Sequence, residues 1–148
     1  MIERVEATPS FPSVVQVVLD TTDVRGLAEF YRKLLGFAYR AGDQPPAGDQ
    51  IDERGQDWLV IHHPSGSPRI AFQQVATLQR STWPQHEVPQ QLHLDLSVPT
   101  RRDLEMQHER ALELGATLLY DRSQDEQEPL RVYADPAGHP FCIFVASL

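Results

Sequence analysis

The sequence has a single cysteine, few basic residues and no long apolar run, and each of these shortages excludes something. Because Cys142 is the only cysteine among 148 residues, no disulfide bond can form within the chain, and a cytoplasmic location is expected. Lysine and arginine number 13 against 21 aspartates and glutamates, so the formal net charge is −8. This charge argues against nucleic acid or an anionic membrane as the main partner, since phosphate groups are bound by basic surfaces. No apolar run approaches the roughly 20 residues that span a bilayer, and residues 1–11 lack the apolar stretch of a signal peptide.

The overall composition is that of a folded domain. Hydrophobic residues make up 41% of the chain and charged residues 23%, which suits a globular protein and excludes a wholly disordered one. A chain of 148 residues is long enough to bury one hydrophobic core. We therefore expect residues 1–148 to form one domain.

The first half of the chain predicts one helix among several strands. The run Val14–Leu19 is apolar and β-branched apart from one glutamine, which is typical of a strand. Asp23 offers a helix N-cap, and Gly36 stands where a left-handed C-terminal cap is expected, so the pattern predicts a helix over 23–35. The apolar residues between these caps recur at helical spacing: Leu27, Phe30, Tyr31, Leu34 and Leu35. The other expected elements are a loop over 41–56 and strands over 37–40, 58–62 and 69–75.

The second half repeats this order. Residues 91–98 alternate strictly between polar and leucine or valine side chains, which predicts a half-buried strand. Thr100, with an aspartate three residues on, predicts the start of a helix over 101–114, and Gly115 its end. Further strands are predicted over 117–120, 130–134 and 141–146.

Each half thus has the order β, α, β, β, β, which predicts one supersecondary unit used twice in an α+β domain. Gln16 stands seven residues before Asp23, and His93 seven before Thr100. The first βαβββ module is expected over 12–75, a linker over 76–90 and the second module over 91–146.

Several short motifs resemble those of the vicinal oxygen chelate superfamily, in its glyoxalase-like branch. They are QVVLDTTD over 16–23, FYRKLLGF over 30–37, HLDL over 93–96, LGA over 114–116 and DPAGHPFC over 135–142. The resemblance implies paired βαβββ modules, the glyoxalase/bleomycin resistance/dioxygenase fold, forming a cup-shaped sheet with the helices outside. It also implies a homodimer. It does not fix the reaction, because the superfamily includes isomerases, lyases, dioxygenases, epimerases and antibiotic-sequestering proteins.

In metal-dependent members of this superfamily, four cup positions supply ligands, usually His or Gln, Glu, His and Glu. The resemblance carries these positions onto Gln16, Gln73, His93 and Cys142. Both carboxylates are missing here, so we expect neither a resident metal ion nor any other cofactor. The four side chains are expected to meet in one cavity that holds a neutral-to-polar organic ligand.

His93 and Asp95 are the predicted catalytic pair. They lie two residues apart on one strand and therefore share a face, and a carboxylate beside an imidazole prepares it for acid or base chemistry. The alternative is that they are ordinary polar residues on a half-buried strand. Cys142 lies at the predicted site, although a buried free cysteine usually acts as a small hydrophobe. The remaining predicted ligand contacts are Gln16 and Gln73, through their amides, and Trp58, His62 and Phe144.

Three functions remain open at this point. The first is a glyoxalase-like lyase or isomerase that acts on a small polar metabolite. The second is a binding protein that sequesters a drug or metabolite without chemistry, and the third is a metal-dependent lyase or dioxygenase. In each, the expected partners are a small molecule and a second copy of the chain.

Overall fold

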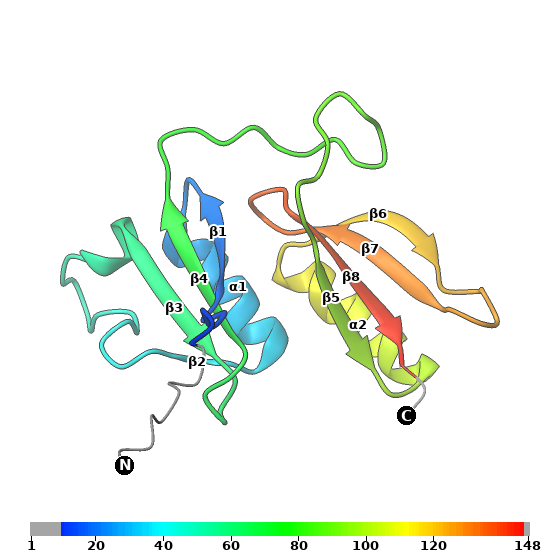
Figure 1. The fold of residues 1–148 in the computed structure, drawn as a ribbon, viewed down its shortest axis with the longest axis horizontal. Coiled ribbons are helices and arrows are strands. Elements are labelled where there is room, and N and C mark those ends of the chain that lie inside the picture. The colour runs from blue at the N-terminus through cyan, green and yellow to red at the C-terminus, as the bar shows by residue number, and fades with distance from the viewer. Residues whose placement is uncertain (1–9, 147–148) are drawn as a thin grey trace, which may run out of the picture.

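A computed structural model describes residues 10–146 and confirms the two βαβββ modules, which lie side by side (Figure 1). The first module contains β1 (Val17–Thr21), α1 (Val24–Leu35), β2 (Ala38–Tyr39), a 3-10 turn (Arg54–Gln56), β3 (Trp58–His62) and β4 (Arg69–Gln74). The second contains β5 (Leu94–Val98), α2 (Arg101–Leu114), β6 (Thr117–Arg122), β7 (Leu130–Ala134) and β8 (Pro140–Val145). The α+β class and the element order are as the sequence predicted.

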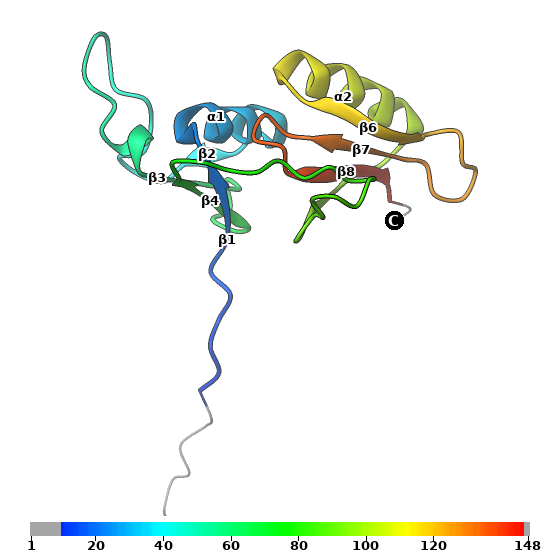
Figure 2. The ribbon, with the colours of Figure 1, turned by 90° about the horizontal axis from the view of Figure 1, so that it is seen from above.

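Each module forms its own four-stranded mixed sheet, with strand orders β1-β4-β3-β2 and β5-β8-β7-β6. The first and last strands of a module are parallel neighbours, and the other pairs are antiparallel. Both helices lie on the same side of the two sheets, and within residues 10–146 no helix covers the opposite side (Figure 2). That uncovered side, called the open face below, is the face from which cup-facing side chains project. Neither helix in the described part of the chain has the length and apolarity needed to cross a membrane.

The helix ends follow the predicted capping chemistry. An Asp23 carboxylate oxygen accepts the Gly26 N–H at 3.0 Å, and the Thr100 hydroxyl accepts the Asp103 N–H at 3.1 Å. Gly36 and Gly115 take the left-handed conformation, with φ of 67° and 117°. This conformation is strained for any residue with a Cβ, which explains why glycine ends both helices.

Strands β1 and β5 each begin three residues later than predicted. β5 pairs with β8 in parallel from Leu94 and Phe141 onward, and β1 pairs with β4 from Val17 and Ile70. The partner strands open at or just after prolines, Pro140 and Pro68, which have no backbone N–H to donate to a ladder. Residues 14–16 and 91–93 therefore remain outside the sheets, although their alternation resembled a strand.

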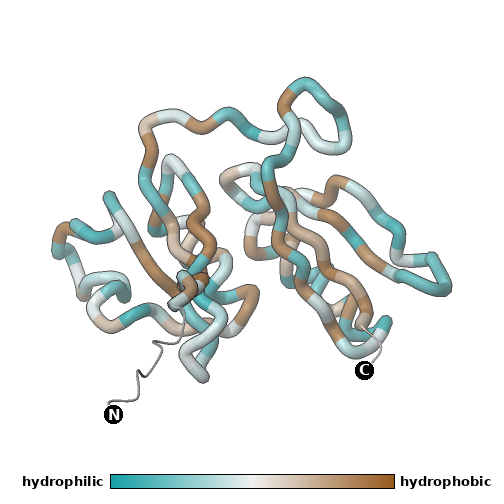
Figure 3. The backbone as a smooth tube through the Cα atoms, in the orientation of Figure 1, coloured by the Kyte–Doolittle hydropathy of each residue, from teal (hydrophilic) through white to brown (hydrophobic). Residues whose placement is uncertain are grey.

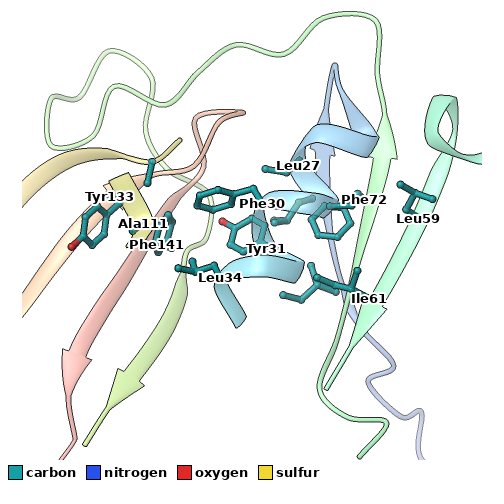
Figure 4. Packing of buried hydrophobic residues seen from close by; sticks show 14 of the residues in the cluster. Leu27, Phe30, Tyr31, Leu34, Leu59, Ile61, Phe72, Ala111, Tyr133 and Phe141 are labelled. Carbon is teal, nitrogen blue, oxygen red and sulfur yellow. The ribbon is translucent and has the colours of Figure 1, made fainter. Parts of the chain in front are cut away.

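One aromatic cluster joins the two modules (Figure 4). Phe30 and Tyr31 of α1 contact Phe141 of β8, with ring centroids 5.8 and 6.0 Å apart. Phe141 also stacks on Tyr133 of β7 at 5.2 Å, and Tyr31 stacks on Phe72 of β4 at 6.0 Å. Because all five rings are buried, the two modules share a single hydrophobic core.

A buried polar contact reinforces this junction. The Tyr31 hydroxyl donates to an Asp135 carboxylate oxygen at 2.7 Å, and burial raises the pKa of Tyr31 well above its usual value, so the proton stays on the donor. The other Asp135 oxygen accepts the N–H groups of Ala137 and His139 at 2.9 and 3.0 Å. Burial raises the pKa of Asp135, and the Tyr31 hydrogen bond opposes this rise. The aspartate of DPAGHPFC therefore organises the hairpin turn between β7 and β8 and also ties that turn to α1.

The predicted loop over 41–56 is held to the rest of the first module by several polar contacts. The buried Asp43 carboxylate accepts the Val60 N–H at 2.9 Å and pairs with Arg54 at 2.7 Å and with Arg40. Asp52 pairs with Arg25 of α1 at 2.8 Å. Hydropathy along the chain follows this arrangement, since apolar residues concentrate in the inner strands and the connecting loops are mostly hydrophilic (Figure 3).

Candidate functional site

The predicted cup residues project from the open face of the two sheets. In β1 and β4 the buried core positions are Leu19, Ile70 and Phe72, so the alternate positions face the other way. By the same alternation, Leu94, Leu96 and Val98 pack against the core from β5, while Asp95 and Ser97 are exposed on the open face. In β8, Cys142 and Phe144 alternate with core residues and therefore face the open side.

Within one chain the four metal-ligand positions do not come together. β1 and β5 run in opposite directions (Figure 1), so Gln16, just before β1, and His93, just before β5, lie at opposite ends of their sheets. The strand registers also change one assignment. In the first module the parallel ladder begins with Val17 opposite Ile70, and in the second it begins with Leu94 opposite Phe141. Ala71, one residue after Ile70, is therefore the counterpart of Cys142, one residue after Phe141. Gln73 lies two residues further along and pairs with Asp20.

His93 and Asp95 do form a pair on the open face. His93 Nε2 lies 3.2 Å from an Asp95 carboxylate oxygen, and the two side chains are 47% and 62% exposed. The register partner of Asp95 is Cys142 on the adjacent strand. This geometry allows the carboxylate to orient the imidazole, but the exposure leaves both groups largely in water, where their interaction is weak.

The residues present do not fit a divalent metal ion. Burial, with a further contribution from Asp95, raises the pKa of Cys142 to about 11, so its thiol stays protonated near neutral pH and is a poor ligand. Ala71 supplies no ligand atom at the equivalent position of the first module. No group of three or more His, Cys, Asp or Glu side chains in residues 10–146 is placed to hold a metal ion.

The remaining predicted contacts are dispersed over the open face. Trp58 pairs across strands with Gln73 and lines a shallow depression of about 580 Å³ together with Arg40 and Arg54. His62, at the other end of β3, directs Nδ1 toward the His63 carbonyl oxygen at 2.8 Å. Phe144 is the register partner of Ser97 in β8. None of the three lies near His93 in the strand registers.

A cavity lies between the modules and under the linker. Its volume is about 590 Å³, and we call it the intermodule cavity. Its walls are formed by parts of β1 and β4, the residues just before β5, the turn before β8 with the start of β8, and the linker. Its lining residues are Val18, Leu19, Asp20, Gln73, Leu78, Gln79, Ser81, Glu87, Val88, Pro89, Gln90, Gln91, Leu92, Ala137, Gly138, His139 and Pro140.

Of the predicted site residues, only Gln73 lines this cavity. His139, which sequence reasoning did not select, directs Nε2 to the Asp20 carbonyl oxygen at 2.6 Å. Because a carbonyl oxygen only accepts, Nε2 is the donor and the ring is fixed against the first module. The sequence did not predict that linker residues line a cavity, because an irregular segment rich in Gln and Pro is typical of a connection between modules. The one available signal was the polar density of the segment between β4 and β5, which brings three amides (Gln79, Gln90 and Gln91) and Glu87 to the cavity wall.

Comparison with known proteins places this architecture in a family. The family described as "Glyoxalase-like domain" matches residues 16–144. The chain therefore belongs to the glyoxalase-like domain family, within the vicinal oxygen chelate superfamily that its motifs resemble. No curated protein was found to match the sequence.

Solved structures of the same fold cover nearly the whole chain. A hypothetical protein from S. aureus is 18% identical, with a TM-score of 0.64 over 93% of this chain and 100% of the other. A glyoxalase/bleomycin resistance/dioxygenase family enzyme from Burkholderia phytofirmans is 17% identical, with a TM-score of 0.64 over 88% and 96%. The fosfomycin resistance protein FosX from Listeria monocytogenes, solved with Mn(II) and a dihydroxypropylphosphonic acid, is 14% identical, with a TM-score of 0.66 over 94% and 95%. At these identities the likeness establishes the fold alone.

Proposed function

We propose that this protein binds a small polar organic molecule in the intermodule cavity. The observation that carries the proposal is the cavity itself, whose volume of about 590 Å³ lies within the roughly 300–1,000 Å³ usual for small-molecule sites. Its walls combine apolar side chains such as Val18 and Leu92 with amide, hydroxyl and carboxylate groups. The structure of FosX with a phosphonic acid is an instance of this fold holding a small polar compound.

The test is to locate binding on the chain and then to block it. Amide chemical shifts of the ¹⁵N-labelled protein are followed while small sugars and amino acids are added. We expect changes at Gln73, Leu92 and Gly138. Gln91→Trp should fill the cavity from the segment just before β5 and abolish these changes, whereas Gln85→Trp, an exposed linker change outside the cavity, should preserve them. Shift changes confined to the depression beside Trp58 would contradict the proposal.

Catalysis is the second candidate, and the observation that favours it is the His93–Asp95 pair at 3.2 Å. His93 follows Leu92, a cavity-lining residue, so an acid or base at this position stands at the rim of the site. A lyase or isomerase of this kind would lose nearly all turnover in His93→Ala but only part of it in Asp95→Asn. A binding protein would show unchanged affinity in both variants and no turnover.

The purified protein should hold no stoichiometric divalent ion. An imidazole, glutamine amides and a protonated thiol do not compensate the dehydration of such an ion. We expect metal analysis of protein purified without chelator to give well below one ion per chain, and added zinc to leave the thermal midpoint unchanged. Zinc that copurifies near one per chain and is lost in His93→Ala would overturn this expectation and favour the metal-dependent lyase or dioxygenase.

We further propose that two copies of the chain form a homodimer through the segment that precedes β1. In this segment Phe11, Val14 and Val15 are 80%, 93% and 63% exposed. The segment extends away from the sheets on their uncovered side (Figure 2). Three exposed apolar side chains in one short stretch are costly in water, and a second copy that covers them removes that cost.

Light scattering at tens of micromolar should therefore give twice the 16.8 kDa mass of one chain. Replacing Phe11, Val14 and Val15 together by serine should yield monomers. The matched control is Ile51→Ser, which removes an equally exposed apolar side chain from the loop over 41–56 and should leave the dimer intact. A monomer in the unaltered protein would refute the proposal.

A further inference from the structure

We infer that the intermodule cavity selects a ligand that carries a protonated amine, together with hydroxyl or amide groups. This inference rests on the proposed function, because it names the class of molecule that the same cavity takes. Three observations support it. The cavity wall is negatively charged, its acceptor groups have few hydrogen-bond partners within the chain, and the rest of the wall combines amide and hydroxyl groups with apolar side chains.

The first observation is the sign of the charge. Two carboxylates, Asp20 and Glu87, line the cavity, and no lysine or arginine does. The only basic lining residue is His139, which already donates Nε2–H to the Asp20 backbone carbonyl. A partly enclosed space with walls of one sign focuses the electrostatic potential and concentrates ions of the opposite sign.

The second observation is that the acceptor groups of the cavity wall have few hydrogen-bond or ion-pair partners among residues 10–146. Among residues 10–146, neither Asp20 carboxylate oxygen takes part in a hydrogen bond or ion pair, and Glu87 accepts only a long bond of 3.4 Å from the Thr82 hydroxyl. The side-chain oxygen of Gln90 is buried and has no hydrogen-bond partner within this range. All three are acceptors, and a protonated amine offers three donors with the complementary charge.

Arg80, which follows the lining residue Gln79 in the chain, makes its contacts outside the cavity. Arg80 donates to the Pro136 carbonyl at 2.9 Å and packs its side chain against Gly138, but it does not line the cavity. Among residues 10–146 it forms no ion pair with Asp20 or Glu87, and neither carboxylate pairs with any other cation of the chain. This arrangement retains negative charge in the cavity without a cation from the chain itself.

The third observation concerns the rest of the ligand. Four glutamines (73, 79, 90 and 91) and Ser81 present both donors and acceptors, whereas Val18, Leu78 and Pro140 give apolar contact. Amide side chains pair well with hydroxyl and amide groups, and the apolar residues suit the faces of a compact carbon skeleton. An amine on a hydroxylated skeleton, as in an amino sugar, satisfies both kinds of wall.

The experiment compares three probes of one skeleton that differ in charge: glucosamine, glucose and gluconate. Titration is followed through the backbone amides of Gln73, Leu92 and Gly138. We expect glucosamine to bind at least tenfold more tightly than glucose, and gluconate to bind more weakly than glucose. The double variant Asp20→Asn/Glu87→Gln should bring the affinity for glucosamine to that for glucose, measured on the same variant.

The control variant is Asp125→Asn/Glu126→Gln, which removes the same charge from the exposed loop between β6 and β7. It should preserve the preference for glucosamine, and loss of the preference there would mean that net charge, not the cavity, attracts the amine. Equal binding of all three probes at the cavity amides would overturn the amine selectivity but leave the proposed binding function standing. If none of the probes shifts these amides, while other small molecules do, the ligand class is wrong. If no small molecule shifts them, the proposed function fails as well.

Discussion

Replacing Phe141 by alanine should lower the free energy of unfolding by about 3–5 kcal/mol. Phe141 is fully buried and contacts Phe30, Tyr31 and Tyr133, so its removal leaves a void where the two modules meet. Because the surrounding rings come from different modules, they can collapse into the void only if the modules shift relative to one another. The effect is measured by urea denaturation followed by circular dichroism.

The chain supplies a matched control three residues away. Phe144 lies on the same strand but faces the open side and is only half-buried, so Phe144→Ala removes the same atoms from a less enclosed place. Its loss of stability should be clearly smaller than that of Phe141→Ala. Equal losses for the two variants would show that the junction between the modules is not the tightly packed centre described above. The same variant also tests the binding site. If Phe144→Ala keeps the preference for glucosamine, the Phe144 ring does not contribute to binding of the amine.

Replacing Asp135 by asparagine should cost about 2–3 kcal/mol, because a buried acceptor of three hydrogen bonds becomes a group with only one acceptor oxygen. The new amide N–H₂ would face either the Tyr31 hydroxyl or the N–H groups of Ala137 and His139, all of which are donors. The urea midpoint should fall with an unchanged slope, since the native state stays compact.

Asp125 provides the comparison for this change. It accepts two backbone N–H groups, from Gln127 and Glu128, in the same kind of turn but fully exposed to solvent. Asp125→Asn should therefore leave the midpoint nearly unchanged. Combining Asp135→Asn with Tyr31→Phe should cost less than the sum of the single changes, because both remove the same hydrogen bond. Full additivity would mean that the Tyr31–Asp135 contact contributes nothing to stability.

Much of the fold could be predicted because its signals are local. The helix over 101–114 is predicted to the residue, since Thr100 and Gly115 carry the capping chemistry that begins and ends it. The strands over 58–62 and 130–134 are also correct, because their apolar runs lie inside sheets with neighbours on both sides. The starts of β1 and β5 were wrong by three residues, because alternation in one strand cannot reveal that its partner strand opens at a proline.

The candidate site was less accessible to sequence reasoning. The pairing of His93 with Asp95 was predicted, since residues two apart on one strand share a face. The assignment of Gln73 as the counterpart of Cys142 depends on the registers of two different sheets, and these registers place Ala71 there. The contribution of the linker to the cavity was not predicted, because it depends on how a segment without regular structure folds back over both modules.

The sequence by itself determined the repeated βαβββ units, their capped helices and the family to which they belong. These features depend on the spacing of apolar residues and on turn and capping residues, whose effects extend over only a few neighbouring residues. Only the tertiary structure decided that Gln16 and His93 lie at opposite ends of their sheets, and that Asp20, Glu87 and His139 line one cavity. These cavity residues come from distant parts of the chain. They lie close together because Phe30 and Tyr31 pack against Phe141 and so fix the two modules side by side.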